Sequence, residues 1–345
     1  MSWIALKMLT GDRAKFFGIV LGLTFAALLI TQQGSIFCGL MLRTCAQITD
    51  ITGADLWVMD PSVRFIDDVK PMIETNLYRV RGVEGVRWAV PLYKGIGRAK
   101  LTTAAPDGAP RLVIEQVILL GLDDSSLVGA PQKLYVGSYE RLREPDAVIV
   151  DRVGLRKLFP GQGGDGTDDP DQLRRFLGHE LEMNDRRAVI VGICESSRTF
   201  QTYPVVYTTY SRAKGFVPRE RKPLTYILAK AEPGRDPAEV AARIRARTGL
   251  GTRTSTEFQD LTINYYLKYT GIPINFGITV LLGFLVGTAI AGQTFYNFTI
   301  ENLKQFGALK AMGTSNARIV GMILLQALVV GLLGYGLGVG LAAVF

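Results

Sequence analysis

The sequence has few of the residues that build catalytic and metal-binding sites. Its 345 residues include one histidine, His179, and three cysteines, Cys38, Cys45 and Cys194. Three is an odd number and the spacing matches no zinc motif, so we expect free thiols rather than a metal centre. His179 stands alone beside Glu180, which is typical of an exposed surface position rather than of a metal ligand. No metal site is therefore predicted.

Motifs for phosphate binding and for nucleophilic catalysis are also missing. The sequence contains neither a Walker motif nor a nucleophile elbow. A stretch rich in Gly and Asp, residues 161–171, has no lysine and does not open a helix, which indicates a solvated loop. The adjacent carboxylates Asp168 and Asp169 belong to this loop, so we assign them to solvation rather than to acid–base chemistry. We therefore expect a non-catalytic protein that binds no cofactor of its own.

Charged side chains are absent from three long stretches, residues 16–42, 269–300 and 319–345. A hydrocarbon core about 30 Å thick needs about 20 apolar residues in a helix, and each stretch meets that length. The sequence therefore predicts three membrane-spanning helices. Polar residues interrupt the first stretch near Gln32, so we expect its helix to leave the bilayer there and to continue as a stalk to Leu42. Its apolar run is longer than that of a signal peptide, which argues against cleavage.

Glycines four residues apart occur in the second and third apolar stretches: Gly283 with Gly287, Gly334 with Gly338, and Gly336 with Gly340. Small residues at this spacing allow two helix backbones to approach closely in lipid. Glycine is also common in membrane helices generally, and that interpretation stays open beside close helix packing.

The short flanks of the apolar stretches are basic. Each flank has three basic residues against one acidic residue: Lys7, Arg13 and Lys15 against Asp12 at the N-terminus, and Lys304, Lys310 and Arg318 against Glu301 in the later loop. Short basic flanks lie in the cytoplasm, so residues 43–268 are expected on the far side of an inner membrane. Those residues carry nearly balanced charge without a basic stripe, so no nucleic-acid partner is predicted. Residues 1–15 combine Trp3 with apolar and charged residues, which predicts an amphipathic helix in contact with membrane lipids.

Residues 43–268 have the pattern of an α+β domain, in which residues 146–210 form a smaller subdomain. Runs rich in β-branched and aromatic residues predict strands at 86–93, 112–122, 147–151, 180–183, 188–194, 205–210 and 226–231, with a hairpin turn at Asn184 and Asp185. Helices are predicted at 152–161, at 237–247, and at 67–80 with a break near Pro71. Residues 260–269 are expected to form a second stalk that leads straight into the membrane.

The loop between the second and third stretches carries the most informative pattern. Leu303, Phe306, Leu309 and Met312 recur every three residues, which predicts a short helix with one apolar side. Lys304 and Lys310 lie off that line, Gly313 is placed to end the helix, and Thr314 or Ser315 to cap the next one. The apolar side is expected to dock on a partner protein; the alternative is that it lies on the lipid surface.

At these residues the chain resembles a known family. Residues 306–313, Phe-Gly-Ala-Leu-Lys-Ala-Met-Gly, are similar to the coupling-helix signature of FtsX-like permeases, the MacB and Lol type of ABC transporter (type VII). The longer run from Glu301 looks closest to the DevC-like branch. Residues 147–151, 158–161 and 187–194 are similar to the periplasmic core of the family. The resemblance implies an α-helical transmembrane bundle with a large α+β extracytoplasmic domain of the MacB-like type.

The resemblance also implies a function and partners. Such permeases transmit motion from a separate ATPase subunit, which binds the ATP, to the periplasmic domain. Expected partners are that ATPase, a second copy or a related permease, and, for export, a periplasmic adaptor with an outer-membrane duct. The residues expected to meet the ATPase are Glu301, Leu303, Lys304, Phe306, Gly307, Leu309, Lys310, Met312 and Gly313.

The expected organisation is a cytoplasmic helix (1–15), a first span with its stalk (16–42), the extracytoplasmic domain (43–268), a second span (269–300), the coupling helix (301–315) and a third span (316–345). The family has four spans, so a further span is expected beyond Phe345. Two alternatives to export stay open. One is FtsX-like signalling that activates a cell-wall hydrolase, and the other is a membrane-anchored receptor without an ATPase. The transported substrate is not indicated.

Overall fold

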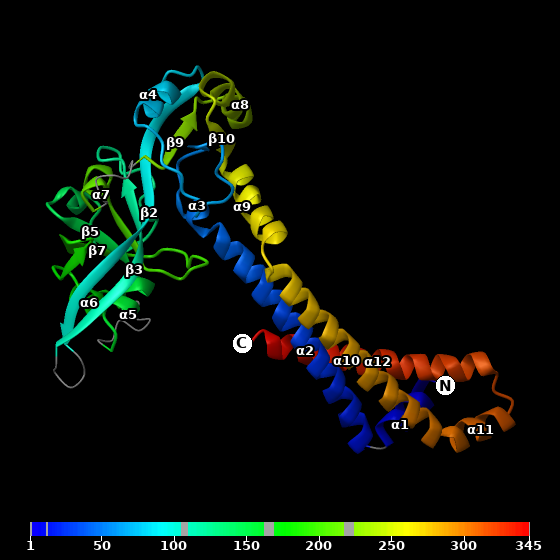
Figure 1. The fold of residues 1–345 in the computed structure, drawn as a ribbon. Helices are drawn as coiled ribbons and strands as arrows, with labels where there is room; N and C mark the ends of the chain where they lie inside the picture. The colour runs from blue at the N-terminus through cyan, green and yellow to red at the C-terminus, as the bar shows by residue number, and fades with distance from the viewer. Residues whose placement is uncertain (1, 12, 105–109, 162–168, 217–223, 345) are drawn as a thin grey trace. The chain divides into compact units, whose positions relative to one another are not determined.

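The chain folds as two compact units. The computed structural model describes residues 2–11, 13–104, 110–161, 169–216 and 224–344 (Figure 1). One unit, the membrane unit, consists of Met1–Leu40 with Tyr269–Phe345, and the other, the large unit, consists of Met41–Lys268. Most of the Gly- and Asp-rich loop predicted at 161–171, including Asp168, lies outside the described residues.

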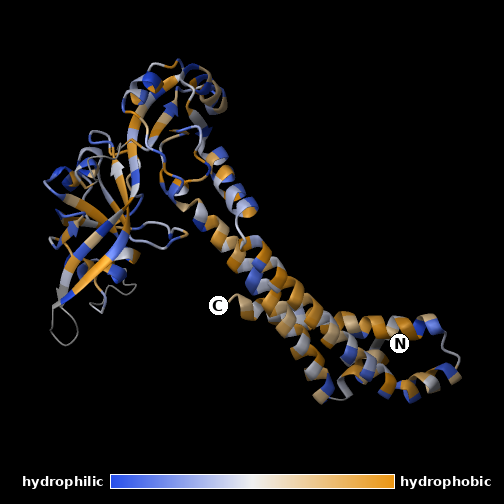
Figure 2. Cartoon of the chain, viewed as in Figure 1, coloured by the Kyte–Doolittle hydropathy of each residue, from blue (hydrophilic) through white to orange (hydrophobic). Residues whose placement is uncertain are grey.

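Within the residues that the structure describes, the membrane unit is built of helices joined by short turns. Its helices are α1 (Ser2–Gly11), α2 (Arg13–Thr44), α10 (Ile272–Glu301), α11 (Leu303–Ala311) and α12 (Asn316–Ala342). Three of them, α2, α10 and α12, are long and apolar enough to cross a membrane, and Figure 2 shows them hydrophobic along most of their length. At 1.5 Å per residue they measure about 48, 45 and 40 Å, which exceeds the roughly 30 Å of a hydrocarbon core. The polar residues near Gln32 do not interrupt α2.

A small apolar cluster holds four of these helices together. It joins four helices through the following buried side chains: Leu9 of α1, Ile19 and Val20 of α2, Phe298 of α10 and Val330 of α12. The predicted N-terminal amphipathic helix is therefore present as α1, but one of its faces packs on the helix bundle rather than on lipid alone.

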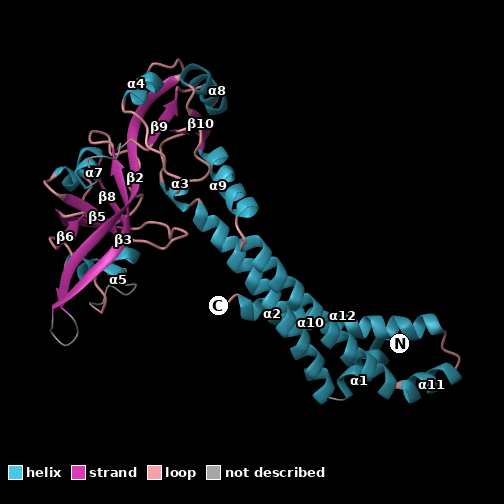
Figure 3. Ribbon diagram, in the orientation of Figure 1, coloured by secondary structure: helices cyan, strands magenta, loops and turns pink. Residues whose placement is uncertain are grey.

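The large unit is built on one mixed sheet of ten strands (Figure 3). The strands are β1 (Leu56–Met59), β2 (Val86–Ala104), β3 (Pro110–Leu122), β4 (Leu134–Gly137), β5 (Ala147–Asp151), β6 (Glu180–Met183), β7 (Arg186–Cys194), β8 (Val205–Thr209), β9 (Tyr226–Ala231) and β10 (Gly251–Thr254). Their order is β10-β1-β9-β2-β3-β8-β5-β7-β4, and β6 pairs with both β2 and β7. The hairpin predicted around residues 184–185 is confirmed as β6 and β7.

Strand β2 joins the two halves of this sheet and is longer than the sequence predicted. Residues 86–92 pair with β9, whereas residues 93–104 pair with β3 in a regular antiparallel register. The strand predicted at 86–93 therefore continues for eleven more residues in β2. Residues 94–100 include glycines and basic residues of low strand propensity, so their extended form comes from pairing with β3 and not from local preference.

Apolar side chains cover both faces of the sheet. Alternate residues of a strand point to opposite faces, and in β1 Leu56 and Val58 join one buried cluster whereas Trp57 and Met59 join the other. The helices and the short 3-10 helix of the large unit are α3 (Ala46–Asp50), α4 (Thr75–Arg81), a 3-10 turn (Glu140–Arg143), α5 (Arg152–Leu158), α6 (Pro170–Arg174), α7 (Tyr210–Phe216), α8 (Pro237–Thr248) and α9 (Ser255–Tyr269). Helices α4, α5, α7 and α8 share the first cluster, and α3 and α9 share the second.

The helix predicted at 67–80 is wrong in its first half. Only Thr75–Arg81 is helical, as α4, and Met72 instead forms an isolated antiparallel bridge with Leu224. Pro71 explains the difference, because a proline disfavours helical geometry at the residue before it and cannot donate its own backbone hydrogen bond.

Helix α9 begins earlier than the stalk predicted from residue 260. The Thr254 hydroxyl accepts from the Glu257 N–H at 3.2 Å, and the Glu257 carboxylate accepts from the Thr254 N–H at 3.0 Å. This reciprocal pair is a capping box, which fixes the start of the helix at Ser255. Helix α9 also does not continue straight into the span, because Thr270 and Gly271 separate its end from α10.

A buried carboxylate organises the turn between β5 and α5. Asp151 caps α5 by accepting from the Gly154 N–H at 2.8 Å, and it also accepts from the Val205 N–H at 2.6 Å. Burial raises the pKa of Asp151 to about 6, although both hydrogen bonds favour the ionised form. The Asp151 carboxylate therefore connects β5, α5 and β8, although burial makes its ionised form less stable than in water.

Candidate functional site

The candidate functional site is helix α11 with the residues at its two ends. Helix α10 ends at Glu301, and the single residue Asn302 turns the chain into α11. The Asn302 carbonyl accepts from the N–H groups of Gln305 and Phe306, both at 3.0 Å, and its side-chain amide donates to the Phe298 carbonyl at 2.8 Å. Asn302 thus accepts hydrogen bonds from the first turn of α11 and donates one to the last turn of α10. No flexible linker separates the two helices.

The other end of α11 is closed by Gly313, as predicted. Gly313 has a φ of +88°, a left-handed conformation that glycine adopts without strain. Its N–H donates to the Lys310 carbonyl at 3.0 Å, and the Thr314 N–H donates to the Leu309 carbonyl at 3.1 Å. These two bonds form a Schellman motif, which ends α11 and redirects the chain towards α12. Ser315 stands at the start of α12 but makes no side-chain cap.

The structure places Phe306 and Leu309 against the chain's own helices, whereas the sequence pattern predicted that they dock on a partner protein. Both are buried, at 6% and 8% exposed, in a cluster with Ala5 of α1 and Met322 of α12. The helical angle explains why only these two are buried. Each residue of a helix is rotated by about 100° from the one before, so a side chain three residues further on is about 60° short of a full turn. The four side chains from Leu303 to Met312 therefore spread over about half of the helix circumference. Phe306 and Leu309, in the middle of this spread, face inward, and Leu303 and Met312 face outward.

The face of α11 opposite this cluster is exposed. Leu303 is 57% exposed and Met312 is 74% exposed, although both are apolar. The other exposed residues of α11 are Lys304, Gln305, Gly307, Ala308, Lys310 and Ala311. Glu301 and Gly313 of the predicted set are also exposed and flank the helix. We call Leu303, Lys304, Gly307, Ala308, Lys310 and Met312 the outer face of α11. It combines two large apolar side chains, two small residues and two positive charges.

Two polar contacts hold the surroundings of α11 in place. The buried side chain of Gln326 in α12 donates from Nε2 to the Ala5 carbonyl of α1 at 2.7 Å. An ion pair joins Lys15 of α2 to Glu301 at the end of α10. Because the Gln326 contact lies next to the apolar cluster under α11, helix α1 forms a fixed support rather than a loose surface helix. The sequence pattern singled out neither Ala5 nor Gln326.

The glycines singled out for helix packing do not all behave alike. A Cβ atom added at Gly287 would lie 2.5 Å from the Ala26 Cβ of α2, and one at Gly334 would lie 2.7 Å from the Leu23 Cβ. Gly338 is equally close to α2, whereas Gly283 leaves ordinary contact distances. Gly336 and Gly340 have no neighbour within 4 Å. One stripe on each of α10 and α12 thus lies against α2, and the other glycines of the pattern do not.

The residues considered for catalysis or metal binding stay apart. Within the described ranges, His, Cys, Asp and Glu side chains form no group of three that could hold a metal ion. The ring of His179 is exposed and lies edge-on against Phe159, with 5.3 Å between the ring centroids. Cys38 is exposed, and Cys45 and Cys194 are buried free thiols whose pKa values are raised by burial.

Comparison with known proteins assigns both units of the chain. Residues 16–247 match the MacB-like periplasmic core domain, and residues 277–345 match the FtsX-like permease C-terminal family. The uncharacterized ABC transporter permeases MT0078 and Rv0072 of two Mycobacterium tuberculosis strains are each 27% identical over 173 residues, which are 50% of this chain and 46% of each relative. The chain thus spans about half the length of the curated relatives it matches.

Solved extracytoplasmic domains also resemble part of the chain. The extracellular domain of the noncanonic ABC-type transporter YknZ from Gram-positive bacteria has a TM-score of 0.39 at 13% identity, covering 59% of this chain and 99% of that domain. The periplasmic region of MacB from Actinobacillus actinomycetemcomitans has a TM-score of 0.40 at 13% identity, covering 65% of this chain and 96% of that region.

The match to the periplasmic core covers well over half of the chain, and the match to the permease C-terminal region covers α11, α12 and most of α10. The three apolar helices fit insertion into the inner membrane as a multi-pass protein. The chain therefore belongs to the FtsX- and MacB-like permeases of ABC transporters, the type VII class.

Proposed function

We propose that the chain is the non-catalytic membrane subunit of an export system and transmits motion between a separate ATPase and its large unit. The observation that carries the proposal is the division of α11 into an anchored side and an exposed side. Phe306 and Leu309 fix the helix to α1 and α12, and the outer face is left for a partner. ATP is then bound and hydrolysed by that partner.

A helix can transmit force only if it cannot rotate or slide on its support. Burying a Phe or Leu side chain stabilises such a contact by roughly 1.5–3 kcal/mol. The Schellman motif and the Asn302 junction fix the two ends of α11, so displacement of α11 moves α10 and α12 with it. The anchored side therefore supports a coupling role and not only docking.

The outer face has the chemistry of a docking surface. Gly307 and Ala308 are small, so a partner backbone can approach closely, and Leu303 and Met312 offer apolar area at either end. Lys304 and Lys310 can pair with carboxylates at the rim, which favours the orientation of a partner. The name of the curated relatives, ABC transporter permease, supports an ATPase as that partner.

The remaining parts of the assembly are extensions of this proposal. A second copy of the chain, or a related permease, would pair with a second ATPase. A periplasmic adaptor and an outer-membrane duct would complete an export path, in which the large unit acts on the adaptor. The proposed docking of an ATPase on the outer face of α11 is independent of the exported substrate.

The experiment co-expresses the full chain with a candidate ABC ATPase subunit from the same organism and measures co-purification and ATPase activity in nanodiscs. Leu303→Asp replaces one of the two large apolar side chains of the outer face by a charge, and we expect it to lower both readouts about ten-fold without loss of insertion. Ile114→Asp is the matched control, because Ile114 is an exposed apolar residue of the large unit.

Phe306→Ala separates anchoring from docking. It removes a buried side chain, so we expect lower thermal stability together with lower coupling, whereas Leu303→Asp lowers coupling alone. Normal co-purification and activity for Leu303→Asp, with Phe306→Ala equally active, would contradict the proposal.

A further inference from the structure

The large unit contains a cavity of about 370 Å³ where β2 leaves β9 and pairs with β3. Its walls come from four parts of the unit: strands β2 and β3, the segment 67–71, the loop that carries Gln201, and Thr225 just before β9. The volume is within the range of small-molecule sites, which are usually lined by apolar side chains with a few polar groups. It is far from α11 in sequence and plays no part in the docking surface described above.

Most of the cavity lining is apolar. Val69, Pro71, Tyr93, Ile96 and Ile118 contribute hydrocarbon and aromatic surface. Taking about 30 Å³ for each non-hydrogen atom, as for a water molecule, the cavity has room for about a dozen such atoms. This is the size of a small aromatic or short-chain molecule and not of a bilayer lipid.

One wall carries a buried charge. Lys94 is 4% exposed, and its ammonium donates to the Asp67 carboxylate and to the Ile66 carbonyl. An ammonium has three N–H donors, and these two are its acceptors among the described residues. Burial lowers the pKa of Lys94 even though Asp67 opposes the shift. The third N–H of Lys94 is left for a hydrogen-bond acceptor on a ligand, such as a carboxylate or phosphate oxygen.

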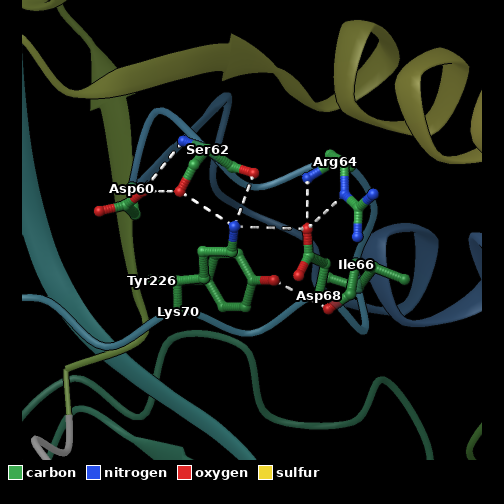
Figure 4. A network of polar contacts seen from close by, with 7 residues as sticks. All are labelled: Asp60, Ser62, Arg64, Ile66, Asp68, Lys70 and Tyr226. Carbon is green, nitrogen blue, oxygen red and sulfur yellow. Dashed lines mark hydrogen bonds and ion pairs between the residues drawn. The ribbon is translucent and has the colours of Figure 1, made fainter.

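The wall that holds Asp67 is fixed by a network of polar contacts (Figure 4). The Tyr226 hydroxyl donates to the Ile66 carbonyl at 2.8 Å, the same oxygen that accepts from Lys94. Further along the segment, the Arg64 N–H donates to Asp68 at 3.0 Å, and Lys70 donates to Ser62 at 3.0 Å. The cavity is thus preformed, which reduces the entropy lost when a ligand binds.

We propose that this cavity binds a small amphiphilic anion, with its apolar body against Ile96 and Ile118 and its carboxylate or phosphate head beside Lys94. A cationic head fits less well, because an ammonium has no acceptor for the remaining N–H of Lys94. The site is independent of the proposed ATPase coupling, so its test does not use ATP.

The test uses the full chain in nanodiscs and three probes of equal shape and different charge: 2-naphthoate, the 2-naphthylmethyl ammonium ion and 2-naphthylmethanol. Binding is measured by equilibrium dialysis, with empty nanodiscs subtracted. We expect 2-naphthoate to bind at least ten-fold more tightly than the ammonium probe. The double variant Asp67→Asn with Lys94→Gln removes both charges and should abolish this preference while the alcohol still binds.

A second variant tests the position of the site without touching the ion pair. Ile96→Trp fills the cavity and should lower 2-naphthoate affinity at least ten-fold. Ile114→Trp is the matched control, because both isoleucines are 51% exposed and Ile114 does not line the cavity. Equal binding of the three probes, no binding of 2-naphthoate, or equal affinity of the two Trp variants would each overturn the proposal.

Discussion

Replacing Gly338 by alanine tests how closely α12 lies against α2. The added Cβ would lie 2.6 Å from the Ala27 Cβ, 2.7 Å from the Thr24 carbonyl oxygen and 2.9 Å from the Leu28 nitrogen. Two of these three atoms belong to the backbone of α2, so no side-chain rotation can relieve the overlap. The helices must separate, and overpacking of this kind destabilises by about 1–3 kcal/mol.

Gly340 gives a matched control on the same helix, because nothing lies within 4 Å of its added Cβ. Both substitutions gain about 1 kcal/mol of helix propensity, so their difference isolates the packing term. We expect Gly338→Ala to be less stable than Gly340→Ala by about 1–3 kcal/mol, which is about 5- to 150-fold in the unfolding equilibrium constant.

The assay is unfolding of the full chain in mixed micelles, followed by helical circular dichroism as dodecyl sulfate is titrated. Gly283→Ala should resemble the control, since its nearest neighbour, Ile30, would be at an ordinary 3.5 Å. Equal midpoints for Gly338→Ala and Gly340→Ala would refute close contact between α12 and α2.

Three further predictions concern other parts of the chain. Gly313→Val forces a branched side chain into a left-handed conformation and should destabilise the end of α11 by about 1–2 kcal/mol, measured by thermal unfolding in nanodiscs, whereas Gly307→Ala, which meets no neighbour within 4 Å, should not. Because the folded pKa of Asp151 is raised to about 6 from the ordinary 3.8, the folded state holds its proton more tightly. The contribution of Asp151 to stability should therefore be greatest below pH 4 and fall as the pH rises to about 6, by up to about 3 kcal/mol; denaturant unfolding at several pH values should show this slope as a difference between the wild type and Asp151→Asn. Cys45 and Cys194 should react with maleimide only after unfolding, whereas their labelling in the native protein, detected by mass spectrometry, would contradict their burial.

The spans were predictable because a bilayer imposes a length and a composition that few soluble helices share. The end of α11 was predictable for a similar reason, since Gly313 satisfies a local backbone requirement. The direction of α11 was not. Apolar residues that recur every three positions spread over about half of the helix circumference. Which of them face inward depends on α1, a segment about three hundred residues earlier in the chain.

The large unit shows the same limit. Strands with strong local patterns, such as β5 and β7, were predicted nearly to the residue. The second half of β2 was missed, because Gly95 and Lys94 are extended only through pairing with β3. The cavity beside Lys94 was missed as well. A single lysine in a polar segment carries no sign of burial until Asp67 and Ile66 are brought to it from another part of the chain.

The contact between Gln326 and Ala5 has a consequence for biogenesis. The two residues are 321 positions apart. At about 5–20 residues per second, the ribosome needs roughly 15–65 s between the two. During that interval α1 has no partner in α12, although its Leu9 can already pack on Ile19 and Val20 of α2. The support under α11 is therefore incomplete until α12 has been synthesised, so a chain that lacks α12 cannot hold α11 in the position seen here.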